Sequence, residues 1–122
     1  MRRYKVTLTT AADGTVIGYS PRLAGKIHAV HYVKGDFADG VDFTITAEAT
    51  GETIWTESNV NASTVRYPRA ATHSTAGVAS LFAAGGTAVQ APVAIANDRV
   101  KLSIAQGGAA KSGTFHLLVD EG

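Results

Sequence analysis

The stretch "VDFTITAE", residues 41–48, decides the fold class. Apolar residues occupy every second position, and polar residues fill the positions between them. Side chains of a β-strand point alternately to opposite faces, so this pattern predicts a strand with one buried and one solvated face. The next residues, "ATGE", predict a tight turn, and "TIWTES" at 53–58 predicts a returning strand that places Ile54 or Trp55 in the core. The residues expected to face inward on the first strand are Val41, Phe43, Ile45 and Ala47.

The same period of two recurs on both sides of this hairpin. Upstream, it predicts strands at 4–9, at 15–19 and at 25–35, with an Asp-Gly turn after the first. Pro21 is expected to end the second of these, because proline cannot donate to a strand ladder. Downstream, "RVKLSIA" and "TFHLLVD" predict two further strands. Short strands at regular turn spacing, with no persuasive long helix, predict a single all-β domain over 1–122, an antiparallel β-sandwich of jelly-roll type.

Composition narrows the classes of function. Formal net charge is +1, too small to steer the chain toward nucleic acid or an anionic membrane. There is no cysteine, which excludes disulfides, thiolate catalysis and cysteine-ligated zinc. Charged residues make up 17%, below the roughly 25% of ordinary globular domains. Small side chains replace them, and such plain surfaces suit close packing against other protein chains.

The uncharged stretch at 76–96, "AGVASLFAAGGTAVQAPVAIA", is long enough to span a bilayer. Its glycines, proline and polar residues, with few large aliphatic side chains, predict instead that it lies outside the membrane. Residues 76–84 are compatible with a short helix, but two short strands around Gly85-Gly86 are favoured. Its apolar side chains either contact neighbouring subunits or complete the second sheet of the chain's own sandwich, and both alternatives stay open.

The stretch "AQGGAAKSGTFH", residues 105–116, looks superficially like a phosphate-binding loop. A phosphate loop requires glycine directly before the Lys-Ser pair and a helix after it. Here Ala110 precedes Lys111, and an apolar strand pattern follows. We therefore predict a hairpin loop joining the last two strands, with glycines serving positive φ angles and no nucleotide cofactor.

No set of side chains predicts a metal site or a catalytic centre. His28 and His31, three apart on a strand, are expected on opposite faces, and His116 on the outer face of the last strand. The aspartates of "DFADGVD" lack the order of a calcium loop. The hypothesis of a small hydrolase or sugar-binding module would use Glu48, Glu52 or Glu57, but the first two flank an exposed turn. We therefore expect no enzyme activity, no cofactor and no metal.

Three segments carry a resemblance to a known family. They are "YVKGDFADGVDFTITAEATGETIWTESNVNAS" at 32–63, "RYPR" at 66–69 and "NDRVKLSIAQGGAAKSGTFH" at 97–116. Together they resemble small virion structural proteins of tailed bacteriophages and prophages, usually encoded near the capsid genes. The likeness extends over most of the chain, and it consists of strand and turn signatures rather than a catalytic motif.

By analogy with other small β-sandwiches of phage heads, the resemblance implies a capsid decoration (cement) protein. Such a protein would sit on the outer shell of the virion, after assembly in the host cytoplasm, and clamp neighbouring major capsid protein subunits. A homo-oligomer, a dimer or trimer, is expected; nucleic acid and membrane are not expected partners. The alternative is a tail- or fibre-associated component or a glycan-binding module. Expected partner-contact residues are Arg2, Arg3, Arg66, Tyr67, Arg69, Val78, Leu81, Phe82, Val89, Val93 and Ile95.

Overall fold

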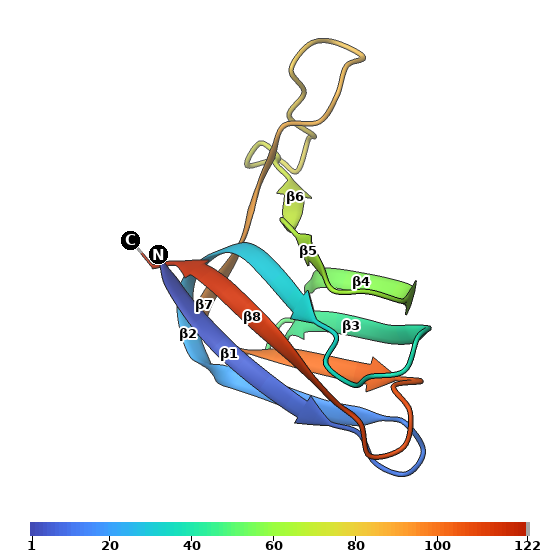
Figure 1. Ribbon diagram of the computed structural model, residues 1–122. Coiled ribbons are helices and arrows are strands. Elements are labelled where there is room, and N and C mark those ends of the chain that lie inside the picture. Colours follow the sequence, from blue (N-terminus) through green and yellow to red (C-terminus); the bar gives the residue numbers. More distant parts are fainter. Residues whose placement is uncertain (122) are drawn as a thin grey trace.

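The computed structural model describes residues 1–121, and over that range the chain is all-β, as predicted. Every strand pairing is antiparallel. The two ends of the chain lie side by side, because the first and last strands pair along their whole length (Figure 1). The strands are β1 (Arg2–Thr9), β2 (Val16–Val33), β3 (Val41–Ala47), β4 (Thr53–Val60), β5 (Thr64–Arg66), β6 (Arg69–Ala71), β7 (Gln90–Ala105) and β8 (Ser112–Asp120).

The strands form one sheet in the order β1-β8-β2-β7-β3-β4, with β5 added to β2 and β6 to β7. The long strand β2 holds the sheet together. Its first part, from Val16 to Ile27, pairs with β7, and its second part, from Lys26 to Val33, pairs with β8. The β1–β8 half and the β7–β3–β4 half of the sheet are therefore both attached to this one strand.

The core lies between these two halves, which face each other across a cluster of aromatic rings. Phe43 of β3 lies 5.2 Å from Phe115 of β8 and 5.0 Å from Tyr32 of β2, measured between ring centroids. Because β3 and β8 do not pair in the sheet, this contact means that the sheet folds over on itself, which is compatible with the expected sandwich. The Tyr32 hydroxyl is buried without a hydrogen-bond partner, and burial raises its pKa to about 12.

The predicted inward faces are confirmed. The apolar positions of 41–47 are all buried, and so are the alternate apolar positions of the last two strands. Ile54 and Trp55 are both buried although they are neighbours in the sequence. The register of β3 against β4 shifts between Ile45 and Thr46, so Ile54 occupies a bulge between paired residues.

Pro21 does not end a strand, contrary to the prediction. The strand β2 continues through it, because the register against β7 shifts between Tyr19 and Arg22 and leaves Ser20 and Pro21 in a bulge. The Ser20 hydroxyl accepts a hydrogen bond from the Val100 N–H at 2.9 Å and donates one to the Pro21 carbonyl at 2.7 Å. The missing N–H of the proline therefore removes no bond from the ladder.

The connection at 106–111 is not a hairpin loop, contrary to the prediction. A strand follows it, as expected, but β7 and β8 do not pair with each other. The loop instead crosses from one half of the sheet to the other. Of its glycines, Gly108 has a positive φ of 85°. Gly113, just inside β8, is needed for a different reason: a Cβ there would lie 2.4 Å from two ring atoms of the buried Phe37.

Candidate interaction surface

The most conspicuous feature of the molecule is an arm, residues 69–92, that projects from the sheet (Figure 1). At its base, β6 pairs with Gln90–Pro92 of β7. Beyond the base, the Thr72 N–H donates to the Val89 carbonyl at 2.8 Å, and two turns follow, closed by bonds from Gly77 to Ser74 and from Gly86 to Ala83. The arm is therefore held together by backbone hydrogen bonds.

The arm contains no helix at 76–84, and the two short strands predicted around Gly85-Gly86 are not formed either, because the pairing there is limited to isolated bridges. Isolated bridges join His73 to Ala79 and Leu81 to Ala88. Two glycine turns, at Gly77 and Gly85, have positive φ values of 79° and 71°, which explains why a helix-compatible alanine-rich stretch is broken there.

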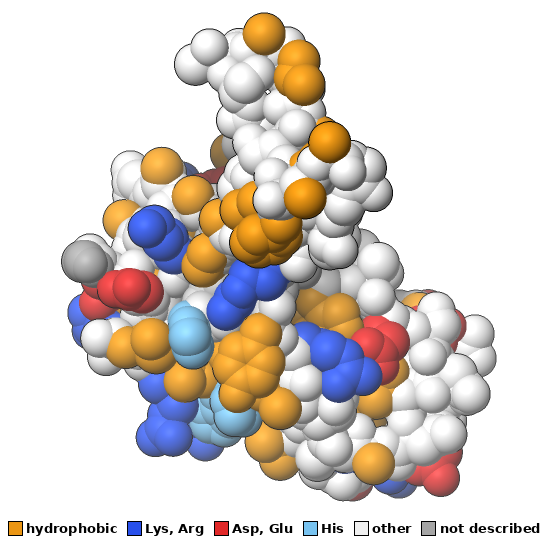
Figure 2. Space-filling view, turned by 90° about the horizontal axis from the view of Figure 1, so that it is seen from above, with side chains coloured by type: hydrophobic (Ala, Val, Ile, Leu, Met, Phe, Trp, Pro, Cys, Tyr) orange, Lys and Arg blue, Asp and Glu red, His pale blue; other side chains and the backbone are white. Residues whose placement is uncertain are grey.

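The arm has no core of its own. Between residues 71 and 92 no side chain is buried. Three of its apolar side chains are open to solvent: Val78 is 66% exposed, Leu81 43% and Phe82 76%. Figure 2 shows hydrophobic side chains spaced along the projecting part of the molecule. These three are among the predicted contact residues, and the fold leaves them exposed.

The remaining apolar residues of the predicted contact set fall elsewhere. Val93 and Ile95 are buried, 3% and 5% exposed, where β7 enters the body, so they fill the chain's own core. The prediction of partner contact is corrected for these two residues. Val89 is half-buried near the base of the arm. The two alternatives for the uncharged stretch thus divide along its length: its end belongs to the core, and its middle is exposed.

The "RYPR" residues fix the base of the arm. The Arg69 guanidinium donates to the His28 carbonyl at 3.1 Å and to the Pro68 carbonyl at 2.7 Å. The exposed ring of Tyr67 stands edge-on to His28, with the ring centroids 5.7 Å apart. These contacts set the direction in which the arm leaves the body.

Arg66 is engaged within the chain. Its guanidinium donates twice to Glu57, at 2.9 Å each, and lies over the Trp55 ring at 5.7 Å. Trp55 also donates to Glu57, at 3.0 Å, and packs edge-on to Phe43 in the core. These hydrogen bonds lower the pKa of Glu57 against the opposing effect of its burial. Because Trp55 is only 7% exposed, its ring is not available to stack on a sugar.

The carboxylates considered for catalysis do not converge. Glu48 pairs with Arg99, whose hydrogen bonds lower the pKa of the Glu48 carboxyl. Glu57 pairs with Arg66 on another strand, and Glu52 is exposed at the turn. Across residues 1–121, no group of three or more His, Asp or Glu side chains is placed to hold a metal ion.

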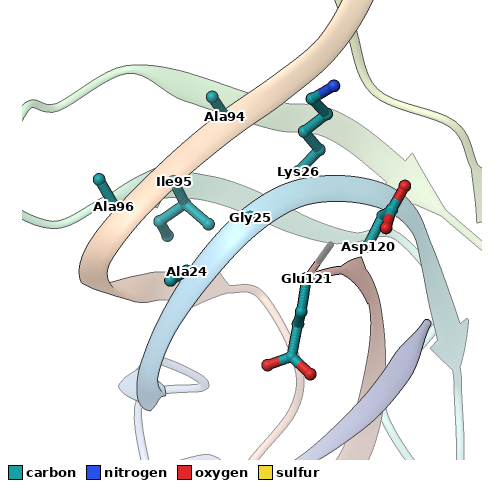
Figure 3. A pocket seen from close by; sticks show the side chains of 8 residues that line it. All are labelled: Ala24, Gly25, Lys26, Ala94, Ile95, Ala96, Asp120 and Glu121. Atoms are coloured by element: carbon teal, nitrogen blue, oxygen red, sulfur yellow. The ribbon is translucent and has the colours of Figure 1, made fainter.

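A shallow cleft of about 440 Å³ lies beside the arm, where β7 passes β2 and the end of β8 (Figure 3). Gly25, in its lining, lets the end of β8 approach β2 closely, since a Cβ there would lie 2.2 Å from the Asp120 carbonyl oxygen. Its charged residues are Lys26, Asp120 and Glu121, and their side chains point in different directions in Figure 3. Glu121 accepts a hydrogen bond from the Tyr4 hydroxyl at 2.6 Å, which raises the pKa of Tyr4.

The two N-terminal arginines lie on opposite faces of the edge strand β1. Arg2 stacks over the ring of Tyr4 on its own strand, 5.1 Å from the centroid. Arg3 is exposed on the outer face, next to Leu118 in the pairing with β8. Arg3 therefore presents its guanidinium to the outside, without an ion-pair partner among residues 1–121.

Comparison with protein-family models and with curated proteins found no match to this chain. Within residues 1–121 the structure contains no helix with the length and apolar character needed to cross a membrane.

Proposed function

We propose that this chain is a non-enzymatic structural protein of a tailed-phage virion, a capsid decoration protein that bridges major capsid protein subunits on the outside of the head. The observation that carries the proposal is the arm: an ordered projection whose apolar residues Val78, Leu81 and Phe82 are uncovered. The resemblance of 32–63, 66–69 and 97–116 to phage virion proteins directs the proposal to this class of partner.

The arm lacks a packed apolar face of its own, and this favours contact with a partner. A two-stranded hairpin without a packed face is only marginally stable in water, so the arm gains most when another surface covers it. Burial of its apolar side chains contributes about 25 cal/mol for each Å² removed from water. That gain is small for one copy, but a shell that displays many copies multiplies it, especially if the protein is itself a dimer or trimer.

The placement is tested by electron cryo-microscopy of purified particles that contain the protein. We expect density of the size of this sandwich on the outside of the head, with the arm reaching across a boundary between capsid subunits. Density only in the tail, or absence of the protein from particles, would refute the placement and favour the tail or fibre alternative.

The role of the arm is tested separately, by excising it. Thr72 and Val89 are hydrogen-bonded neighbours, so residues 73–88 can be replaced by Asn-Gly, a two-residue hairpin turn. This variant should fold, because the deletion removes no buried side chain. It should fail to sediment with capsid shells that lack the protein, whereas the intact chain should bind them. Equal binding by both would assign the contact to the body of the sheet.

A further inference from the structure

Away from the arm, the outer face of the sheet brings four basic side chains together. Arg3 and Lys5 alternate on β1, and both point away from the core. In the sheet, Lys5 pairs with His116 of β8, and His116 pairs with His31 of β2, so these three form one cross-strand row. Side chains directly opposite each other on neighbouring strands lie within about 5.5 Å at Cβ, so the row is continuous.

This row borders a small hollow. Its volume is about 140 Å³, and its walls are Arg3, His31, His116 and Leu118. One wall is thus apolar, and the other three carry N–H groups.

One polar atom of the hollow is buried without a partner, and the two cationic side chains beside it have no ion-pair partner among the described residues. Neither Arg3 nor Lys5 forms an ion pair within the described residues, where the ion pairs join Lys34 to Asp39, Arg66 to Glu57 and Arg99 to Glu48. The Nδ1 atom of His116 is buried and has no hydrogen-bond partner. A buried polar atom without a partner costs about 1–3 kcal/mol, a cost that a ligand bound in this hollow would relieve.

The charged groups that act on His116 are all basic, although Asp120 lies four residues further along the same face of β8. Burial lowers the pKa of His116, and the neighbouring charges of Arg3, Lys5 and His31 lower it further. No carboxylate is among the groups that act on it. The β5 residue that completes the row, opposite His31, is the uncharged Val65.

We propose that this hollow is a binding site for a compact oxyanion, a carboxylate or a phosphate, held by Arg3, His116 and His31 with Lys5 alongside. An oxyanion accepts hydrogen bonds from the Arg3 guanidinium and from the imidazole N–H groups that line the hollow. Hydrogen bonds between charged groups are the strongest of their kind. A divalent metal ion would have only two imidazole ligands here and would face two cationic side chains, so the charges favour an anion.

The proposal fixes the sign of the pH dependence. A bound anion stabilises the protonated form of His116, so its pKa rises on binding. Affinity must therefore increase as the pH falls through the range in which the imidazole takes up its proton, up to the limit of tenfold per pH unit for one linked proton.

The site is tested by NMR titration of the ¹⁵N-labelled full chain with inorganic phosphate, at about pH 5.5 and about pH 7.5. We expect saturable shifts centred on the imidazoles of His31 and His116, with tighter binding at the lower pH. Arg3→Gln and His116→Gln should each weaken binding about tenfold, the worth of one charge-assisted hydrogen bond. Arg2→Gln is the matched control, because it removes the same charge from the neighbouring residue on the other face of β1.

A second titration, with a short acetylated tri-glutamate peptide, separates the two sources of the anion. Binding of the peptide, displaced by phosphate, supports a carboxylate from a partner protein; binding of phosphate alone supports a free phosphate. Shifts that are weak, spread over the surface and equal in Arg3→Gln and Arg2→Gln would overturn the proposal. A response to Ni²⁺ with none to either anion would also overturn it and assign the histidine pair to a metal.

Discussion

Replacement of Phe82 by serine tests whether the arm is built for contact rather than for folding. The ring is 76% exposed, so most of its hydrophobic surface is unused in the isolated chain. Complete burial of a phenylalanine side chain contributes about 1.5–3 kcal/mol. Three quarters of that, about 1–2 kcal/mol, is still to be gained when a partner covers the ring. Since 1.4 kcal/mol corresponds to tenfold in Kd, Phe82→Ser should weaken each contact with the capsid about tenfold.

The same substitution should leave the fold nearly untouched. The free energy of unfolding, measured by urea denaturation, should change by no more than about 0.5 kcal/mol, as for other exposed positions. Binding is measured by sedimentation with capsid shells that lack the protein. The matched control is Ile17→Ser, which changes a 56% exposed apolar residue on β2, in the body of the sheet, and should alter neither quantity.

Two results would refute this reasoning. A loss of more than about 2 kcal/mol of stability in Phe82→Ser would mean that the ring contributes to folding, as core aromatic residues do. Unchanged binding in Phe82→Ser together with weaker binding in Ile17→Ser would move the contact surface from the arm to the body.

Three further substitutions test the body itself, each by urea denaturation. Tyr32→Phe should raise the free energy of unfolding by about 1 kcal/mol at neutral pH, because it removes a buried hydroxyl without a partner; a loss of stability would show that the hydroxyl is hydrogen-bonded. Ser20→Ala should lower it by about 1–3 kcal/mol, because the Val100 N–H loses its acceptor, and an unchanged value would contradict the role of the bulge. Glu48→Gln should destabilise the protein at neutral pH. Arg99 lowers the pKa of the Glu48 carboxyl in the folded chain, so this stabilisation is present above the unfolded pKa and is lost as the pH falls through the folded one. A difference from the wild type that persisted in acid would contradict that ion pair.

The sequence predicts the strands well where one face of a strand is buried. Val41, Phe43 and Ile45 alternate with polar residues because the pleat of the strand places these three side chains on its buried face. The same alternation of buried and exposed side chains holds in the C-terminal parts of β7 and β8. Such local periodicity does not carry information about which strands pair. For this reason the loop at 106–111 looked like a hairpin connection, although it crosses between the halves of the sheet.

The bulge at Pro21 and the basic hollow were missed for related physical reasons. Proline is unfavourable in a strand ladder because it has no N–H to donate. It is accommodated within β2 because the Ser20 hydroxyl accepts the hydrogen bond of the Val100 N–H, from a residue far away in the sequence. The alternation of β1 already places Arg3 and Lys5 on its polar face. Their proximity to His116 and His31 depends on the register among three strands far apart in the sequence, which no local pattern encodes.

The distribution of charge along the chain supports a contact role for the arm, in addition to the shape of the arm. All 11 Lys and Arg and all 10 Asp and Glu residues lie outside 70–97, so the arm beyond Arg69 contains none of these charged residue types. Solvated surfaces usually carry about 25–35% charged residues, which keep a protein soluble and resist association. Charged groups must also lose water when a partner covers them, at a cost that pairing often fails to recover. A neutral arm on a charged body avoids that cost where contact is expected and retains solubility elsewhere.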